Sequence, residues 1–315
     1  MKCFFITGLE GFVGGHLGEY LINNGYNVGG TIFGPENEFI GKFKKDLYLC
    51  ECDICDKNKI QRIISEFKPD FLIHLAAVSY IPFSWKEPVK TYQINLNGSI
   101  SVLEALKNSS PKTKMIFISS CNVYGKGNGK YPITEKTPQN PDNFYGLSKA
   151  MGEELCRFYM KKFGLNIIIL RPFNHIGPGQ SPEFAISSFA RQIALIEKGK
   201  QSREIITGDI SSSRDFTDVR DIIKGYRMIA ESSMDSGVFN ICSGKPVIIK
   251  DALNLLLKQA KVKVKILQDK KKFRPSEIPV YYGSFKRLKN AVGWKPEITF
   301  EQTLIDILQF WRERV

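Results

Sequence analysis

A glycine-rich turn directly after the first apolar run is the feature that most constrains the fold. The run CFFIT leads into TGLEGFVGGHL, in which Gly8, Gly11 and Gly14 stand three residues apart. Glycines at this spacing permit a tight turn, close approach of the backbone to a pyrophosphate, and close packing of a helix on a strand. The N-terminus of the following helix offers N–H groups and a positive dipole end to phosphates. The motif therefore predicts a dinucleotide-binding site.

Apolar runs of strand length alternate with helical patterns over the first 175 residues. The strands are expected at 3–7, 26–33, 47–53, 71–77, 115–120 and 166–172, and the helices near 12–24, 57–67, 85–107 and 143–163. Continuous apolar runs indicate strands that are buried on both faces, and alternation of strand and helix gives a parallel sheet covered by helices. We therefore predict an α/β fold, a Rossmann-type doubly wound parallel sheet with a smaller α/β substrate-binding domain.

The pattern changes after Pro172, and the remaining elements belong to interleaved pieces. A loop and a helix, a second helix and the short strand GVFNICSG come first; a helix near 249–260, an alternating KVKVKI strand and helices near 284–291 and 300–313 follow. Alternation in KVKVKI places the lysines on one strand face and the apolar residues on the other. We assign 1–173 plus about 215–242 to the dinucleotide-binding domain, and about 174–214 plus 243–315 to the substrate-binding domain.

Composition narrows the classes of partner. The net charge of +13 would suit nucleic acid, but the lysines are scattered and no known nucleic-acid-binding module is present, so we expect no such partner. No stretch reaches the ~20 apolar residues of a membrane span. The N-terminus has no small-residue cleavage site, so a cytoplasmic protein with free thiols is expected. Cys50, Cys52 and Cys55 cluster without a fourth ligand at a suitable spacing, and no metal is predicted.

The motif YGLSK places Tyr145 and Lys149 four residues apart, on one face of a helix. A tyrosine of pKa about 10 is a poor acid or base near neutrality. An ammonium group beside it stabilises the phenolate. Ser120, at the end of the fifth strand, could hold a substrate oxygen with its hydroxyl. The order of glycine motif, serine and YxxxK predicts redox chemistry on a bound dinucleotide.

Whether the dinucleotide is NAD(H) or NADP(H) is left open by the sequence. An Asp at the end of the second strand would exclude a 2′-phosphate, and an Arg would favour it. Thr31, Ile32 and Phe33 stand there instead. Asp53 and Ile54, at the end of the third strand, suit the edge of the adenine.

These residues resemble the extended short-chain dehydrogenases/reductases that act on nucleotide sugars. The match runs nearly end to end, and it is most similar to GDP-4-keto-6-deoxy-D-mannose reductases and, more distantly, to GDP-mannose 4,6-dehydratases. The motifs that carry it are TGLEGFVGGHL, HLAA (74–77), INLNGSISVLEA (94–105), SSCNVYG, YGLSK, RPFNHIGPGQ (171–180), SRDFTDVRD (213–221) and RPSEIPVYYGSFKRLKNAVGWKPEITFEQTL (274–304).

The resemblance implies that Ser120, Tyr145 and Lys149 form a catalytic triad, and that Asn95 steadies the active-site helix and a proton-relay water. The cofactor-binding residues are then Gly8, Gly11, Phe12, Val13, Gly14, Asp53, Ile54, Leu75, Ala76, Ala77, Asn95, Tyr145 and Lys149.

The resemblance also implies a diphosphate clamp of Arg214 and Arg274, with Glu277 on the nucleotide ribose. Guanidinium groups bind phosphate oxygens in a bidentate way, although a surface ion pair is an alternative for either arginine. The substrate-binding residues are then Ser79, Ser120, Cys121, Asn122, Asn174, Arg191, Arg214, Arg274 and Glu277.

Cys121 and Asn122 stand where the 4,6-dehydratases of this family carry groups that include a glutamate. Elimination of water needs a base and an acid, whereas asparagine does not titrate and a thiol is a weak acid. The chain is therefore expected to reduce a GDP-4-keto-6-deoxyhexose at C4 with NAD(P)H, to a product such as GDP-D-rhamnose. A C4 dehydrogenase or 4-epimerase on an intact GDP- or UDP-sugar with tightly bound NAD is the alternative, and a non-catalytic dinucleotide sensor a weaker one.

A homodimer is also expected by resemblance. In this family the helices that correspond to 85–107 and 143–163 form a four-helix bundle with those of a second subunit. Apolar side chains of Leu103, Leu106, Leu155 and Phe158 are available for it.

Overall fold

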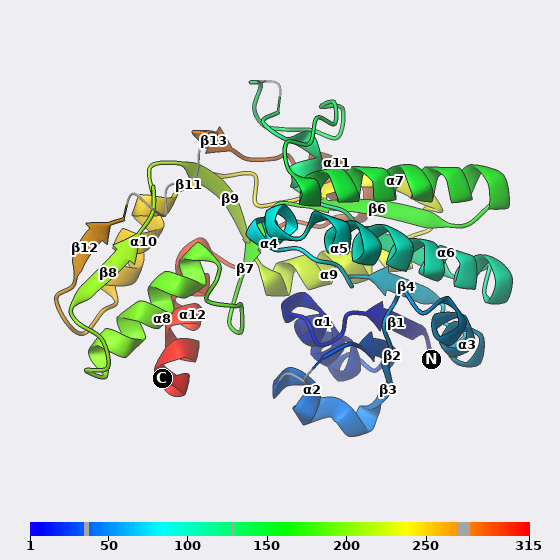
Figure 1. Cartoon of the computed structure of the whole chain (residues 1–315), viewed down its shortest axis with the longest axis horizontal. Coiled ribbons are helices and arrows are strands. Elements are labelled where there is room, and N and C mark those ends of the chain that lie inside the picture. Colours follow the sequence, from blue (N-terminus) through cyan, green and yellow to red (C-terminus); the bar gives the residue numbers. More distant parts are fainter. Residues whose placement is uncertain (35–37, 128, 270–277) are drawn as a thin grey trace.

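A sheet of seven parallel strands forms the centre of the computed structural model, which describes residues 1–34, 38–127, 129–269 and 278–315 (Figure 1). The spatial order of the strands is β10-β6-β5-β4-β1-β2-β3, and each neighbouring pair is parallel. The predicted doubly wound parallel sheet is confirmed. The strands are β1 (Cys3–Thr7), β2 (Asn27–Ile32), β3 (Leu47–Glu51), β4 (Phe71–His74), β5 (Lys114–Ile118), β6 (Ile167–Pro172) and β10 (Ser236–Ile241).

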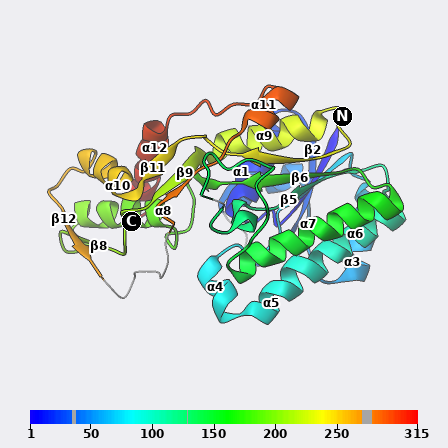
Figure 2. The ribbon, with the colours of Figure 1, turned by 90° about the horizontal axis from the view of Figure 1, so that it is seen from above.

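Helices cover both faces of this sheet, because its central strands are apolar on both sides. Figure 2 shows α1, α9 and α11 on one side of the strands and α3, α6 and α7 on the other. Two separate cores result: Leu17 and Ile222 belong to the first, and Ile60 and Cys156 to the second. The helices are α1 (Phe12–Asn23), α2 (Glu38–Phe43), α3 (Lys57–Phe67), α6 (Gly98–Ser109), α7 (Phe144–Phe163), α9 (Val219–Glu231) and α11 (Lys286–Val292); a 3₁₀ turn (Lys44–Asp46) precedes β3.

The region expected to be one helix over 85–107 is divided into several elements. It consists of α4 (Ile81–Lys86), α5 (Pro88–Tyr92), a π-helical turn (Gln93–Asn97) and α6. Pro88 stands at the first position of α5. It has no N–H to donate to a carbonyl of the preceding turn, so the helix is interrupted at Glu87. The expectation of a continuous helix was wrong for this reason.

Two of the four apolar residues that were expected to be available for contact with a second subunit are buried within the chain itself. Leu103 and Leu106 are 0% and 1% exposed and pack in the core between the sheet and helices α3, α6 and α7. Leu155 is partly buried against the same core, and Phe158 is 52% exposed. Helical periodicity identifies an apolar face, but the neighbouring element decides whether that face is already covered.

A smaller α/β unit lies beyond the carboxyl ends of the parallel strands. In it β9 pairs with β7, β11 and β13, and β12 pairs with β8. The expected strand in KVKVKI begins only at Lys265, although the alternation of exposed lysines and half-buried apolar residues holds from Lys261. The elements are β7 (Asn174–Ile176), α8 (Ala185–Glu197), β8 (Glu204–Thr207), β9 (Ser213–Asp218), β11 (Pro246–Ile248), α10 (Ile249–Lys258), β12 (Lys265–Gln268), β13 (Val280–Tyr281) and α12 (Phe300–Arg314).

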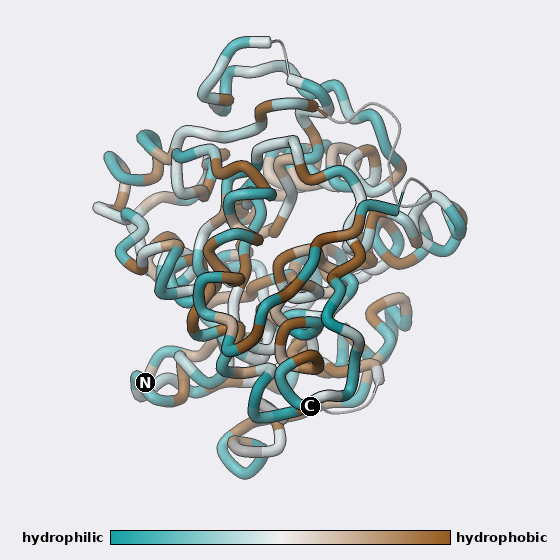
Figure 3. The backbone as a smooth tube through the Cα atoms, turned by 90° about the vertical axis from the view of Figure 1, so that its left-hand side faces the viewer, coloured by the Kyte–Doolittle hydropathy of each residue, from teal (hydrophilic) through white to brown (hydrophobic). Residues whose placement is uncertain are grey.

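The domain division drawn from the sequence stays a prediction. Around its boundaries, β9 pairs inside the smaller unit, whereas Leu288 of α11 packs into the core of the large sheet. In Figure 3 the hydrophobic stretches lie mostly towards the middle of the molecule and the hydrophilic ones towards its edges. Across the described ranges, no helix combines the length and apolar character that a membrane crossing needs.

Candidate active site

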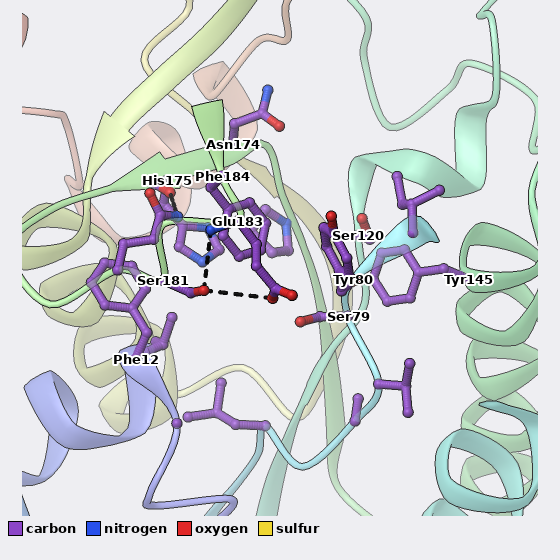
Figure 4. A pocket seen from close by; sticks show the side chains of 18 of the residues that line it. Phe12, Ser79, Tyr80, Ser120, Tyr145, Asn174, His175, Ser181, Glu183 and Phe184 are labelled. Atoms are coloured by element: carbon purple, nitrogen blue, oxygen red, sulfur yellow. Dashed lines mark hydrogen bonds between the residues drawn. The ribbon is translucent and has the colours of Figure 1, made fainter. Parts of the chain in front are cut away.

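A cavity of about 1620 Å³ lies at the carboxyl ends of the parallel strands. The loops after β1, β4, β5 and β6 form one wall, and α8 and β9 of the smaller unit form the other. Figure 4 shows Ser120 and Tyr145 on one side of the cavity and Phe12 and His175 on the other. Open α/β sheets bind their ligands at this edge, so the topology alone marks the cavity as a candidate active site.

The glycine loop has the shape that a pyrophosphate needs. Gly8 has a φ of +73°, and a Cβ there would lie 2.9 Å from Cα of Ala76. A Cβ at Gly14 would collide with the carbonyl oxygen of Gly8. Helix α1 then begins at Phe12 with no side chain capping its first N–H groups, which leaves them for a ligand. The loop therefore fits a dinucleotide phosphate.

The predicted cofactor-binding residues reach this cavity from the loops after β1, β3 and β4 and from helices α1 and α7. Asp53 and Ile54 follow β3, and the Asp53 side chain also accepts a hydrogen bond from the Cys55 N–H at 2.9 Å. The Thr7 hydroxyl, which accepts from the Ala76 N–H at 3.2 Å, fixes the loop after β4. The predicted residues that line the cavity are Gly8, Gly11, Phe12, Val13, Gly14, Asp53, Ile54, Leu75, Ala76, Ala77, Tyr145 and Lys149.

Asn95 does not line the cavity but holds two of its walls together. Its Oδ1 accepts from the Val78 N–H at 2.8 Å, and its Nδ2 donates to the Val78 carbonyl and to Ser148 Oγ. Val78 belongs to the loop after β4, and Ser148 stands on α7 between Tyr145 and Lys149. The residue lies in the π-helical turn, a feature often found at functional sites. Asn95 thus links the loop after β4 to α7 through its side-chain amide.

Ser120, Tyr145 and Lys149 all line the cavity. Ser120 is the second residue after β5, and its Oγ accepts hydrogen bonds from the backbone and side-chain nitrogens of Asn122 at 3.1 and 3.0 Å. Its own hydroxyl hydrogen therefore remains for another acceptor. Burial raises the pKa of Tyr145 to about 12, and a hydrogen bond with Ser120 acts in the opposite direction. A phenolate here needs a further positive charge.

Lys149 stands one helical turn after Tyr145 on α7 and lines the same cavity. Its Nζ donates to the Ile118 carbonyl at 2.8 Å and lies 5.3 Å from the centre of the Phe117 ring. Burial lowers the pKa of Lys149 to about 8, so keeping its ammonium charged raises the free energy of the folded protein. A bound anion would offset this cost.

This burial predicts a pH effect on stability. The folded-state pKa of Lys149 is below its usual value of 10.5, so the unfolded chain binds more protons between pH 8 and 10.5. Wild-type stability should therefore rise over this range, relative to Lys149→Met, by up to ~3 kcal/mol. Denaturant unfolding of both proteins at several pH values measures the difference. A difference that stays constant would contradict a buried ammonium.

Cys121 and Asn122 bring no carboxylate to this place. Burial raises the pKa of the Cys121 thiol to about 12, and its backbone carbonyl accepts from the Tyr281 hydroxyl at 2.6 Å. The side-chain amide of Asn122 donates a hydrogen bond to Ser120 Oγ. Both residues shape the short 3₁₀ turn (Cys121–Tyr124) and line the cavity, but neither supplies an acid that works near neutrality.

The substrate-binding residues predicted on the smaller unit are partly brought together. Asn174 on β7 donates to the Asp215 carbonyl at 3.3 Å, and Arg214 on β9 donates to the carbonyls of Ser213 and Ile278, each at 2.9 Å. Both line the cavity, as does Ser79 on the loop after β4. Asp215 itself is fully buried, and accepts from three N–H groups on two separate segments, those of Ser243 and Gly244 and that of Gly283. It therefore fixes β9 and the arginine beside it.

Three of the predicted substrate-binding residues are not seen at the cavity. Arg191 is exposed on α8, and its guanidinium lies 5.8 Å from the centre of the Trp311 ring. It is not among the residues that line the cavity. Arg274 and Glu277 lie outside the described residues, so their roles stay predictions from the resemblance.

Sequence reasoning missed several residues that line the cavity. Glu10 stands inside the glycine motif, and Phe33 follows β2. Figure 4 shows Glu183 and Ser181 at the opposite wall, where the Ser181 hydroxyl lies 3.5 Å from the Glu183 carboxylate. Glu10 could have been found as the one charged residue between the glycines of the motif, whereas nothing in the sequence around Glu183 sets it apart.

The buried histidine at the end of β4 is held by two hydroxyl groups, and the cysteines form no disulfide. His74 lies between the hydroxyls of Thr7 and Ser99, at 2.8 and 3.0 Å, and burial lowers its pKa to about 3. All seven cysteines are free thiols. Within the described residues, no group of three or more His, Cys, Asp or Glu side chains could hold a metal ion.

Comparison with known proteins decides the family. The model of the GDP-mannose 4,6-dehydratase family matches residues 5–307. The chain belongs to this family. Within the family, GDP-6-deoxy-D-mannose reductase of Pseudomonas aeruginosa is 37% identical over 99% of this chain and 97% of its own length. A putative UDP-glucose 4-epimerase of Methanocaldococcus jannaschii is 30% identical over 98% and 97% of the two chains.

Solved structures agree with this family assignment. A structure of RMD from Pseudomonas aeruginosa complexed with NADPH superposes with a TM-score of 0.88 and 37% identity, and covers the whole of both chains. A putative epimerase from Burkholderia cenocepacia reaches 0.87 at 28% identity, over 99% and 98% of the chains. Proteins named as a reductase and proteins named as putative epimerases thus both resemble this chain over nearly its whole length.

Proposed function

We propose that this chain reduces a GDP-4-keto-6-deoxyhexose at C4 with NAD(P)H, giving a GDP-6-deoxyhexose such as GDP-D-rhamnose. The observation that carries the proposal is the pairing of an intact Ser120, Tyr145 and Lys149 site with Cys121 and Asn122, which supply no acid for elimination. The relative named as GDP-6-deoxy-D-mannose reductase supports this choice.

The side chains can carry out the proton transfer of such a reduction. The reduced nicotinamide, when bound in the cavity, supplies a hydride to C4. Ser120 donates its hydroxyl hydrogen to the C4 oxygen, since its Oγ already accepts from Asn122. Tyr145 then donates its phenolic proton to that oxygen, and the Lys149 ammonium stabilises the phenolate left behind. Asn95 holds α7, and with it Tyr145 and Lys149, against the loop after β4.

Substrate recognition is assigned to residues of the smaller unit and to the loop after β4. The Arg214 guanidinium faces the cavity from β9 and attracts the diphosphate, and Asn174 and Ser79 lie beside the sugar. We assign Arg274 and Glu277 to the diphosphate and the nucleotide ribose from the resemblance. Arg191, which is exposed over Trp311, is a weaker candidate for this role.

A 4-epimerase or C4 dehydrogenase is the second candidate, because relatives named as 4-epimerases match the whole chain. Its triad chemistry is the same, but its cofactor is regenerated within each cycle. A non-catalytic sensor fits poorly, since the three triad residues all line the cavity.

One comparison separates the two enzyme activities. The purified protein is given intact UDP- and GDP-hexoses without added cofactor, and separately a GDP-4-keto-6-deoxyhexose with NADH or NADPH. The reductase consumes stoichiometric reduced cofactor with the keto sugar only. Interconversion of intact hexoses at C4 without added cofactor would assign the chain to the epimerases.

We also propose a homodimer formed through α6 and α7. The outer face of α7 carries Leu147, Met151 and Phe158, which are 40%, 44% and 52% exposed, and Ile100 lies exposed on α6. The spacing of four and seven residues gathers the α7 side chains on one helix face. A continuous exposed apolar face of this kind is typical of an interaction surface.

The dimer predicts a specific response to charge. Met151→Glu combined with Phe158→Glu should convert the wild-type dimer to a monomer, because two buried carboxylates would face the partner. Ile305→Glu, on the exposed side of α12, is the matched control and should leave the dimer intact. Sedimentation velocity measures all three proteins. A wild type that sediments as a monomer at working concentration would rule the dimer out.

Three expectations from the sequence remain predictions: a cytoplasmic location, and the absence of nucleic acid and metal partners. Localisation of the tagged full-length protein tests the first of them.

A further inference from the structure

The side chain of Tyr226, on α9, is fully buried and carries a hydroxyl group that the protein itself does not satisfy. This hydroxyl has no hydrogen-bond partner among the residues that the structure describes. A buried polar group without a partner lowers the stability of the folded protein, so each such group points to a role that the rest of the chain does not explain. Tyr226 also lines the cavity at the carboxyl edge of the sheet. A molecule bound in this cavity can therefore supply the partner.

Tyr226 comes to the cavity from the face of the sheet opposite to Tyr145. Figure 2 shows α9 and α7, the helices that carry the two tyrosines, on opposite sides of the strands. The Tyr226 ring belongs to the same core as Ile118 of β5 and Leu170 of β6, which are neighbouring strands. In the order of the sheet, β5 and β6 are separated by β4 and β1 from β2 and β3, where the adenosine end of a dinucleotide is expected. Tyr226 thus lies at the other end of the cofactor site.

The phenol groups of Tyr226 and Tyr145 interact through their charges. Burial raises the pKa of Tyr226, and Tyr145 raises it further. Tyr226 therefore stays protonated near neutral pH, and its hydroxyl group can both donate and accept a hydrogen bond. In the proposed reduction, Tyr145 acts on the C4 oxygen, next to the nicotinamide carbon that gives up the hydride. The carboxamide of the nicotinamide has both a donor and an acceptor, so it matches what the Tyr226 hydroxyl can offer.

We propose that Tyr226 binds the nicotinamide end of the dinucleotide, through a hydrogen bond between its hydroxyl group and the carboxamide. This rests on the proposed function, since it concerns the cofactor of the same redox site. The hydroxyl gains its partner only when the dinucleotide is bound. No hydrogen bond within the protein has to break first, so the new bond contributes directly to the affinity.

Tyr226→Phe tests the proposal, because it removes the hydroxyl and keeps the buried ring. Wild type and variant are titrated with NADH and NADPH, followed by nicotinamide fluorescence and calorimetry. For the dinucleotide that the wild type binds more tightly, the dissociation constant should rise ~3–10-fold, as expected for the loss of one neutral hydrogen bond. ADP-ribose, or its 2′-phosphate form where NADPH is preferred, has no nicotinamide and should bind equally well to both proteins.

The stability of the protein without added dinucleotide gives a second readout. Tyr226→Phe should leave the midpoint of denaturant unfolding unchanged or raise it, because the hydroxyl has no protein partner to lose. Tyr124→Phe is the matched control. The Tyr124 hydroxyl is also buried, but it accepts from Arg171 at 2.9 Å and donates to Asn240 at 2.7 Å, and Tyr124 does not line the cavity. This control should lower the midpoint and leave the dissociation constant of the dinucleotide unchanged.

The outcomes distinguish this inference from the function on which it rests. If Tyr226→Phe binds the dinucleotide as tightly as the wild type does, the inference fails while the proposed reductase stands. An equal loss of affinity for the dinucleotide and for ADP-ribose would also overturn it, since the nicotinamide would then not be the group that is bound. A higher KM for the sugar alone would assign the hydroxyl to the substrate instead. If the wild type binds neither NADH nor NADPH, the inference and the proposed function both fail.

Discussion

Tyr145→Phe is expected to lower turnover of a GDP-4-keto-6-deoxyhexose by at least ~10²-fold, the usual scale of general acid catalysis. The substitution removes the phenolic proton and retains the ring, which is buried on the cavity wall against Ser120. Because the ring also lines the dinucleotide part of the cavity, the dissociation constant of the cofactor should stay nearly unchanged. Steady-state kinetics and a binding titration on the same preparation measure the two effects.

A matched substitution controls for general damage to the helix. Tyr92 packs its ring against Phe144, the residue before Tyr145, but does not line the cavity. Tyr92→Phe should therefore leave both turnover and cofactor binding unchanged. Turnover by Tyr145→Phe close to that of the wild type would remove Tyr145 from the mechanism.

Arg171→Leu is expected to destabilise the protein by ~3–5 kcal/mol, because it leaves the buried Glu153 carboxylate without its cation. Arg171 on β6 donates to both Glu153 oxygens, at 2.8 and 2.6 Å, and also to the Tyr124 hydroxyl at 2.9 Å. The Ser119 hydroxyl, from the residue before Ser120, donates to the same carboxylate at 2.6 Å. Denaturant unfolding measures the loss.

The surface partner of Glu153 provides the control. Arg157 contacts the same carboxylate at 2.8 Å from the edge of α7, where it is partly exposed. Arg157→Ala should cost no more than ~1 kcal/mol, as exposed ion pairs contribute little. If Arg171→Leu is as mild as Arg157→Ala, the buried pair is not important for stability.

The pH dependence of this pair follows from the direction of the shift. Burial acts to raise the pKa of Glu153, but the hydrogen bonds and charge of Arg171 outweigh it, and the pKa is lower than its usual 4.5. The stability contributed by the pair is therefore present above pH 4.5, and is lost as the pH falls through the folded-state pKa. Wild type and Arg171→Leu should accordingly become more similar in stability in strongly acidic solution.

The sequence predicted the features that depend on local order along the chain. The glycine motif after β1, the run of strands and helices, and the spacing of Tyr145 and Lys149 each require only neighbouring residues. They led to the correct sheet, and to Ser120, Tyr145 and Lys149, which all line one cavity and whose catalytic role stays a prediction. The continuous helix over 85–107 failed at Pro88, whose effect as a helix breaker was visible in the sequence.

Features that depend on distant pairings were not predictable in this way. Leu103 and Leu106 were assigned to an interface because periodicity does not reveal that α3 already covers them. The hydrogen bond from the Phe33 N–H to the Glu10 carboxylate joins residues that are 23 positions apart. The ion pair of Glu153 with Arg171 joins a helix to a strand. Each of these contacts exists only once the sheet has been assembled.

The most direct test of the account supplies the enzyme with two sugars and follows the products by mass spectrometry. Given the preformed GDP-4-keto-6-deoxyhexose and reduced cofactor, the protein should consume the cofactor and form a 6-deoxyhexose, two mass units heavier than the substrate by the addition of hydride and proton. Given GDP-mannose and the oxidised cofactor, it should form no product that has lost water, because Cys121 and Asn122 provide no acid at the C6 hydroxyl. Clean dehydration of GDP-mannose by the native chain would contradict this account and assign the protein to the dehydratases.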